Sequence, residues 1–135
     1  MKKDLQQESE IPLRFVCIIP ARYSSTRFPG KPLVNIGGKT MIQRVYEQAS
    51  KALPDVYVAT DDQRIFDTVT AFGGKAIMTS SQHKSGTDRC YEAFTKLEEW
   101  FDVVINVQGD EPFIQPEQIK ELQKCFDKPE GITLV

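Results

Sequence analysis

Short apolar runs alternate with longer amphipathic stretches along this chain of 135 residues. Phe15–Ile19, Val56–Ala59 and Val103–Val107 are nearly continuous apolar runs of strand length. Such runs are typical of strands that are buried on both faces of a parallel sheet. Lys75–Met78 is a weaker run that we expect near a sheet edge, and Ile132–Val135 predicts the beginning of one more strand.

Amphipathic stretches between these runs predict four helices. The residues expected at their N-terminal ends are, in chain order, Thr40, Asp61 or Asp62, Thr87 or Asp88, and Pro116. Alternating strands and helices at this spacing predict right-handed βαβ crossovers. We therefore expect a three-layer α/β/α, Rossmann-like fold with a mostly parallel sheet. In such folds, ligands bind beyond the carboxyl ends of the strands.

The composition is that of one ordinary globular domain, 40% hydrophobic and 27% charged. We assign residues 14–135 to this domain and residues 1–13 to a flexible N-terminal arm. Lys and Arg number 17 against 19 Asp and Glu, so the net charge of −2 gives no reason to expect nucleic acid as a partner. A bound anion must therefore be held by a local cluster of basic residues.

No apolar stretch approaches the length of a membrane span, and the polar N-terminus lacks the apolar core of a signal peptide. The three cysteines are far apart and form no CxxC pair, which fits a reducing cytoplasm. Cys17 lies in an apolar run and is expected to be a core residue rather than a nucleophile. Because a turn at Gly131 precedes a strand that has only begun, we expect a fragment of a longer protein or a truncated form.

A basic loop, residues 20–32, follows the first predicted strand. It holds Arg22, Arg27 and Lys31 together with three serine or threonine hydroxyls. Backbone N–H groups and hydroxyls can donate to phosphate oxygens while the basic side chains neutralise their charge. The position after a buried first strand favours a triphosphate-binding loop over a solvated loop with incidental basic residues.

The string Gly37-Gly38-Lys39-Thr40 ends like a P-loop but does not satisfy that motif. The motif requires another glycine five positions before Gly38, where this chain has Leu33. We therefore interpret Gly37-Gly38 as a tight turn before a helix.

An acidic residue, Asp110, follows the third predicted strand within Gln108–Pro112. Mg²⁺ prefers one or two carboxylates together with water and substrate phosphates. We favour Asp110 as a magnesium ligand over a turn-forming role, and we interpret Glu111 as a solvated side chain. Gly109 allows close approach of the backbone, and the amide of Gln108 is expected to point into the crevice.

The loop that follows Met78 is polar and rich in hydroxyls, and it is able to close over a base or ribose. His83, the only histidine, has no partner in a nucleophile motif, so we expect a hydrogen-bonding or surface role. For Asp61, which follows the second strand, helix capping is the favoured role, although it borders the same crevice.

Taken together, these loops resemble the bacterial 3-deoxy-manno-octulosonate (Kdo) cytidylyltransferases, or CMP-Kdo synthetases. The similar strings, in the same order and spacing, are residues 19–22, 25–32, 58–61, 83–89 and 106–112. The resemblance covers nearly all of the chain from Phe15 onward. Sialic acid cytidylyltransferases share the general layout, but the strings at 83–89 and 106–112 are closer to the Kdo branch.

The resemblance implies a nucleotide-diphospho-sugar transferase fold, cut short at its C-terminal side. It also implies a cytoplasmic reaction of lipopolysaccharide biosynthesis, in which CTP and Kdo give CMP-Kdo and pyrophosphate with Mg²⁺. The same resemblance implies that Arg22 and Lys31 bind the triphosphate with help from Arg27, and that Pro20, Ala21, Ser85 and Gly86 line the nucleotide pocket. It also implies that Asp110 binds Mg²⁺ and that Gln108 contacts the sugar acid.

Members of that family are roughly twice as long as this chain, and the full-length enzyme is implied to be a homodimer. Their second half would carry another magnesium carboxylate, much of the Kdo pocket and most of the dimer interface. Two alternatives to the Kdo cytidylyltransferase therefore remain open. In the first, the chain is a nucleotide-binding fragment without turnover. In the second, it is a related sugar nucleotidyltransferase such as a sialic acid cytidylyltransferase.

Overall fold

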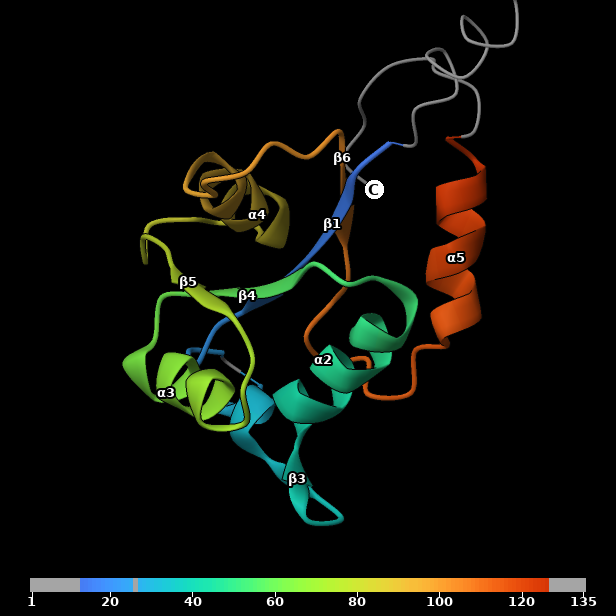
Figure 1. Cartoon of the computed structure of the whole chain (residues 1–135). Helices are drawn as coiled ribbons and strands as arrows, with labels where there is room; N and C mark the ends of the chain where they lie inside the picture. The colour runs from blue at the N-terminus through green and yellow to red at the C-terminus, as the bar shows by residue number, and fades with distance from the viewer. Residues whose placement is uncertain (1–12, 26, 127–135) are drawn as a thin grey trace, which may run out of the picture.

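A four-stranded parallel sheet forms the centre of the computed structural model, which describes residues 13–25 and 27–126 (Figure 1). Its strands are β1 (Phe15–Ala21), β4 (Val56–Thr60), β5 (Ala76–Met78) and β6 (Val103–Asn106). They lie in the order β5-β4-β1-β6, and all three pairings are parallel. The predicted α/β fold class is confirmed, and β5 lies at an edge as expected.

Helices cover both faces of this sheet. They are α2 (Met41–Ala52), α3 (Gln63–Ala71), α4 (Gly86–Thr95) and α5 (Pro116–Lys124). Buried residues of α2, α3 and α5 share one apolar cluster with one face of the sheet, while those of α4 join a second cluster on the other face. Figure 1 shows α4 across the sheet from α2 and α3, which gives the expected three layers.

The continuous apolar run of β1 is explained by this double coverage. Val16 and Ile18 face α4, whereas Cys17 and Ile19 face the opposite cluster, and all four are fully buried. Burial also raises the pKa of the Cys17 thiol to about 12. Cys17 is thus a core residue, as predicted, and its thiol stays protonated at neutral pH.

The strand order reverses beside β1. From β1 the chain steps outward to β4 and β5 through α2 and α3, then returns through α4 on the other face to reach β6. Such a reversal leaves a crevice at the carboxyl ends of the two central strands, here β1 and β6.

Pro20 lies inside β1 instead of ending it, which differs from our expectation. The carbonyl of Ile18 accepts from the N–H of Val107, so alternate residues of β1 direct their polar groups toward β6. The last β6 partner in the register is Asn106, opposite Ile18. Pro20 therefore lies beyond the end of β6, where a strand residue without an N–H breaks no ladder hydrogen bond.

The starts of α2 and α3 agree with the sequence pattern, although the capping role favoured for Asp61 does not hold. Thr40 caps α2 by accepting from the N–H of Gln43. Asp62 caps α3 through the N–H groups of Arg64 and Ile65, whereas Asp61, which we expected to cap, lies 3.7 Å from the Arg89 guanidinium.

The start of α4 corrects the prediction of Thr87 or Asp88 as its first residue. Ser85 is the N-cap, and its hydroxyl accepts from the N–H of Asp88 at 3.1 Å. The helix begins at Gly86, where an added Cβ would lie 3.0 Å from the ring of Pro20. Packing against the end of β1, which local sequence does not reveal, sets this earlier start.

The segment between β1 and α2 contains a short 3₁₀ helix, η1 (Lys31–Leu33), and a two-stranded hairpin of β2 (Asn35–Ile36) and β3 (Lys39–Thr40). Gly37 and Gly38 join the hairpin strands with φ values of 60° and 95°. This confirms the predicted tight turn. The hairpin itself was not predicted, because strands of two residues carry no recognisable periodicity.

Residues 1–12 of the expected N-terminal arm and the strand expected at Ile132–Val135 lie outside the described residues, so these assignments stay predictions. Within residues 13–25 and 27–126, no helix is both long enough and apolar enough to cross a membrane.

Candidate functional site

A cavity of about 400 Å³ opens at the carboxyl ends of β1 and β6. It is lined by Pro20, Ala21, Arg22, Ser25, Arg27, Phe28, Lys31, Pro32, His83, Lys84, Ser85, Gly86, Arg89, Gln108, Gly109 and Asp110. All nine residues that we selected from the sequence are among them. The fold therefore brings three separate loops to one place, although the role of each residue stays a prediction.

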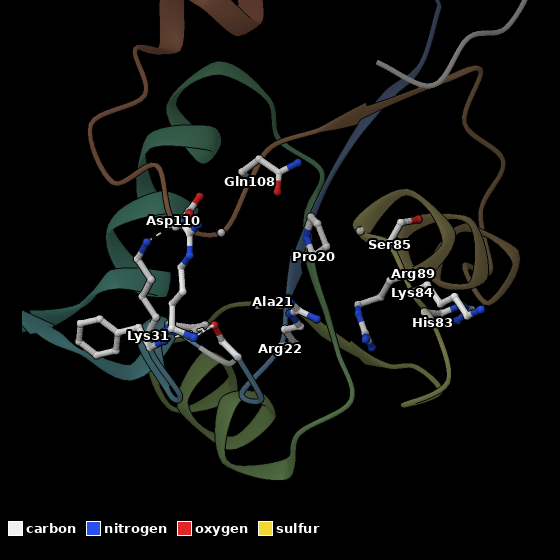
Figure 2. A pocket seen from close by; sticks show the side chains of 16 residues that line it. Pro20, Ala21, Arg22, Lys31, His83, Lys84, Ser85, Arg89, Gln108 and Asp110 are labelled. Atoms are coloured by element: carbon white, nitrogen blue, oxygen red, sulfur yellow. Dashed lines mark hydrogen bonds and ion pairs between the residues drawn. The ribbon is translucent and has the colours of Figure 1, made fainter.

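The cavity has two walls, which face each other across the end of β1 (Figure 2). The first wall consists of residues 108–110 together with six residues of the basic loop, Arg22, Ser25, Arg27, Phe28, Lys31 and Pro32. The second consists of residues 83–86 and Arg89, where the chain enters α4. Figure 2 shows Pro20 and Ala21 in the middle, with Lys31 and Asp110 to one side and Ser85 and Arg89 to the other.

The lining is strongly basic. It includes the five cationic side chains of Arg22, Arg27, Lys31, Lys84 and Arg89, against the single carboxylate of Asp110. The whole chain has a net charge of −2, so this positive field is local. A cleft with one dominant sign of charge concentrates ligands of the opposite sign, here anions with several charges.

Backbone contacts close the base of the loop in the first wall. The N–H of Gly30 donates to the carbonyl of Tyr23 at 2.8 Å. Gly30 adopts a φ of 73°, and an added Cβ would come within 2.8 Å of the Tyr23 ring. This position requires glycine for both reasons. The closure leads directly into η1, whose first residue is Lys31.

Lys31 and Asp110 form an ion pair across the first wall, with Nζ and Oδ2 separated by 3.2 Å. Their side chains are 41% and 54% exposed, so both remain accessible to a ligand. A pair this exposed contributes little to folding stability, about 0–1 kcal/mol. Lys31 and Asp110 can therefore separate at little cost, and each can then contact a charged ligand.

Gly109 holds residues 108–110 against the end of β1. An added Cβ would lie 2.8 Å from the carbonyl oxygen of Pro20, a backbone atom that cannot rotate away. Glu111, next along the chain, is exposed, as expected.

We predict that Gly109→Ala destabilises the fold by about 1–3 kcal/mol, because the new methyl group forces the backbones of β1 and the 108–110 segment apart. The same shift should weaken ligand binding through Gln108 and Asp110. Urea denaturation and ligand titration measure the two effects. Gly38→Ala is the control, because its φ of 95° causes strain but its added Cβ meets nothing and lies outside the cavity lining. Ligand binding that is unchanged in Gly109→Ala would contradict this account.

The second wall contains three basic residues to which the sequence analysis assigned no role in the cavity. Arg89 is only 4% exposed, and its guanidinium donates to the hydroxyl of Thr79 at 2.6 Å and to the carbonyl of Ser80 at 3.1 Å. His83 and Lys84 also line the cavity. Arg89 could not be identified from periodicity, because it directly precedes the buried Cys90 on α4 and two adjacent helical residues rarely share one face.

The N-terminus of α4 adds to the positive field of this wall. Ser85 and Gly86, the N-cap and first residue of a ten-residue helix, both line the cavity. Helix N-termini carry partial positive charge and N–H groups that suit phosphate or carboxylate ligands.

A carboxylate behind this wall, Glu92, is held ionised by its neighbours. Hydrogen bonds from Lys96, from the N–H of Ser80 and from His83 lower its pKa to about 2, with the Lys96 contact the largest cause. The Nε2 atom of His83 lies 2.6 Å from Oε1 of Glu92, which confirms the hydrogen-bonding role expected for this histidine.

This depressed pKa predicts a pH dependence of stability. A group whose folded pKa lies below its usual 4.5 stabilises the fold fully above pH 4.5, and it loses that contribution as the pH falls toward 2. At pH 6 the parent should therefore unfold at a higher urea concentration than Glu92→Gln. The difference between the two urea midpoints should be smaller at pH 4.5 and smaller again at pH 3.5. Glu121→Gln, in an exposed ion pair on α5, should show no such margin. A margin that widens toward low pH would refute the assignment.

Comparison with known proteins agrees with this geometry. The family described as Cytidylyltransferase matches residues 16–130. A 3-deoxy-manno-octulosonate cytidylyltransferase of Bacteroides thetaiotaomicron is 65% identical over 117 residues, covering 87% of this chain and 47% of the relative. An 8-amino-3,8-dideoxy-manno-octulosonate cytidylyltransferase of Shewanella piezotolerans is 55% identical over 119 residues, covering 84% of this chain and 48% of the relative.

Solved structures show the same relationship. A CMP:2-keto-3-deoxy-manno-octonic acid synthetase, complexed with CTP, superimposes with a TM-score of 0.82 and 52% identity, covering 87% of this chain and 49% of that one. A cytidylyltransferase from Leptospira borgpetersenii has a TM-score of 0.73 at 22% identity, over 88% and 51% of the two chains, which shows a shared fold alone.

The chain spans about half the length of the curated relatives it matches. The similarity nevertheless includes every loop that lines the cavity. By this match over residues 16–130 and by its identity to curated relatives, the chain belongs to the cytidylyltransferase family.

Proposed function

We propose that the cavity binds CTP, and that the protein to which this chain corresponds transfers CMP from CTP to Kdo, releasing pyrophosphate. The observation that carries the proposal is that Arg22, Arg27 and Lys31 line one cavity with the half-exposed carboxylate of Asp110, which forms an ion pair with Lys31. A polyanion that brings its own divalent cation fits such a set, because its phosphates meet the basic groups while its metal meets the carboxylate.

Within this proposal the two ends of the nucleotide occupy different parts of the cavity. The triphosphate lies along Arg22, Arg27 and Lys31 in the first wall. The base and ribose lie near Pro20, Ala21, Ser85 and Gly86, where backbone groups and a hydroxyl offer donors and acceptors.

The donor set fits magnesium as a nucleotide-bound ion. Among the described residues, no three His, Cys, Asp or Glu side chains lie close enough together to hold a metal ion. The described lining of the cavity therefore provides one carboxylate ligand, Asp110. One carboxylate is sufficient where phosphates and water complete the coordination. A bound Mg²⁺ would supply charge neutralisation at the phosphates.

The chemistry proposed is direct transfer. The anomeric hydroxyl of Kdo gives its proton to solvent and attacks the α-phosphorus of CTP. The bond from that phosphorus to the bridging oxygen breaks, and its electron pair leaves with pyrophosphate. Lys31 and Arg22 stabilise the charge that develops on this leaving group. Gln108 orients the sugar acid through its amide, so that positioning supplies much of the rate enhancement.

No protein nucleophile takes part in this scheme. Cys17 and Cys90 are buried, and burial raises the pKa of each thiol to about 12. His83 is engaged with Glu92 and has no serine or cysteine hydrogen-bonded to it within the described residues.

The test is CTP binding by calorimetry beside pyrophosphate release from CTP, Kdo and Mg²⁺, both with this 135-residue chain. Turnover supports the full proposal. Binding without turnover supports the nucleotide site and the reading of the chain as a nucleotide-binding fragment. Absence of both contradicts the proposal.

The acceptor sugar is the second point to test. The relative from Shewanella piezotolerans is named for an 8-amino sugar, yet it is nearly as similar to this chain as relatives named for Kdo. We propose Kdo because the relative from Bacteroides thetaiotaomicron, at 65% identity, carries that name. The rate of pyrophosphate release, measured separately with Kdo, its 8-amino analogue and sialic acid, distinguishes the three acceptors.

We further propose that the full-length protein is a cytoplasmic homodimer, with CTP and Kdo as its small-molecule partners. The mass of the full-length protein in solution, measured by light scattering, tests the dimer.

A further inference from the structure

Three side chains on one face of α4 hold the segment by which the chain leaves β5. Arg89, Glu92 and Lys96 follow one another at spacings of three and four residues, which places them in one row along a helix. Lys96, the C-cap, donates from Nζ to the carbonyl of Met78 at 2.7 Å. Arg89 and Glu92 contact the next residues of that segment.

Both backbone polar groups of Ser80 are bound by this row. Its N–H donates to Oε1 of Glu92 at 2.9 Å, and its carbonyl accepts from the guanidinium of Arg89 at 3.1 Å. Ser80 is an exposed residue, so water would otherwise satisfy these groups. Two charged side chains instead fix the peptide groups on both sides of Ser80, at the beginning of the 80–85 loop.

Glu92 also fixes the middle of the 80–85 loop. The same Oε1 atom that accepts from Ser80 lies 2.6 Å from Nε2 of His83. The end of the loop is fixed separately, because Ser85 caps α4. The loop is therefore attached to one helix at its start, middle and end, and Glu92 provides two of these attachments.

Glu92 itself does not line the cavity, whereas His83, Lys84 and Ser85 do. Its side chain is 23% exposed and that of His83 is 22% exposed, so the contact is largely shielded from solvent. Any effect of Glu92 on a ligand must pass through the loop. Figure 2 shows His83, Lys84 and Ser85 together on the side of the cavity opposite Lys31.

We infer that Glu92 is a positioning residue, which holds the 80–85 loop in the shape that forms the second wall of the cavity. The inference rests on the proposed function for its ligand, CTP. When a binding-competent shape is populated only part of the time, the apparent affinity falls by that fraction. Loss of both Glu92 contacts should therefore weaken CTP binding by about tenfold.

The experiment compares the parent chain with Glu92→Ala, Glu92→Gln and Glu121→Ala. Amide hydrogen exchange is first measured without nucleotide. In Glu92→Ala the amides of residues 80–85 should exchange about tenfold faster or more, while those of β1 and β6 keep their rates. His83 is the only histidine, so its imidazole signals are assigned without ambiguity, and they should shift in the same variant.

CTP·Mg²⁺ binding is then measured by calorimetry. Glu92→Ala should raise the Kd about tenfold, whereas Glu92→Gln should stay within about threefold of the parent. Glutamine keeps an oxygen that can accept from Ser80 and His83, so it should rescue the loop. Glu121→Ala removes a glutamate from an exposed lysine pair on α5 and should match the parent in every measurement.

The outcomes separate this inference from the proposed function. Unchanged exchange at residues 80–85 in Glu92→Ala overturns the inference, whether or not CTP binds. Faster exchange with an unchanged CTP affinity also overturns it, because the loop would then not shape the nucleotide site. If the parent fails to bind CTP the proposed function fails, and the exchange rates still decide whether Glu92 holds the loop.

Discussion

Lys31→Ala is expected to weaken CTP binding markedly and, where turnover is observed, to lower its rate by about 10²-fold or more. Nζ of Lys31 lies 3.2 Å from Asp110 at the open face of the first wall, and the side chain is 41% exposed. In the proposed function, a cation at this position stabilises the triphosphate before reaction and the charge that develops on pyrophosphate during it. Removal of one such donor from a transition state typically lowers the rate by about 10²- to 10³-fold.

Calorimetry with CTP·Mg²⁺ and a pyrophosphate-release assay measure this loss. Lys51→Ala is a matched control, because Lys51 is an exposed lysine in the last turn of α2 and is absent from the cavity lining. Urea denaturation of Lys31→Ala should stay close to the parent, since an exposed ion pair contributes little to stability. If the two alanine variants bind CTP equally well, Lys31 is not a phosphate ligand.

Asp110→Asn is expected to abolish the magnesium dependence of CTP binding. Asparagine keeps the size of the side chain but removes the charge that attracts a divalent cation. Even residues that only support a metal ligand typically change metal affinity by about 10- to 100-fold, so loss of a direct ligand should have at least that effect. The parent should bind CTP more tightly in Mg²⁺ than in EDTA, whereas the variant should bind equally in both.

A titration of Mg²⁺ at constant CTP provides the measurement. Glu111→Gln is the control, because the neighbouring Glu111 is exposed and does not line the cavity. It should retain the magnesium dependence of the parent. If Glu111→Gln loses that dependence while Asp110→Asn keeps it, the magnesium ligand is Glu111 and not Asp110.

Local pattern was sufficient for the central sheet. The run Val16–Ile19 is apolar at every position, and each side chain is fully buried because helices cover both faces of β1. Fold class therefore followed from burial, which a run of apolar residues reports directly. The basic loop and Asp110 were also found from sequence, because each follows a predicted strand and the carboxyl ends of parallel strands meet at one edge.

The second wall was only partly found in this way. Ser85 and Gly86 were selected through a family resemblance, whereas Arg89 and His83 were left without a role in the cavity. The contacts of Arg89 reach Thr79 and Ser80, on a loop that precedes α4, and they depend on how that loop folds back over the helix. Helical periodicity describes one helix at a time and contains no information about such a contact.

The start of α4 shows the same limit. Thr87 and Asp88 are both good capping residues, and nothing local excludes them. Ser85 is preferred because Gly86 packs against Pro20 at the end of β1, where an added Cβ would already be 3.0 Å from the proline ring. The choice among three capable caps was made by a contact between residues 66 positions apart in the sequence.

The sequence by itself determined the four strands of the central sheet, its four helices, the sheet edge where the cavity lies and most of the charged groups gathered there. It could do so because local pattern records which residues are buried and where each strand ends. Tertiary structure alone decided that Lys31 meets Asp110 and that Glu92 holds Ser80 and His83. Those contacts depend on the packing of α4 and of residues 108–110 against the end of β1. Packing of this kind depends on the shapes of distant side chains, and no short stretch of sequence contains both partners.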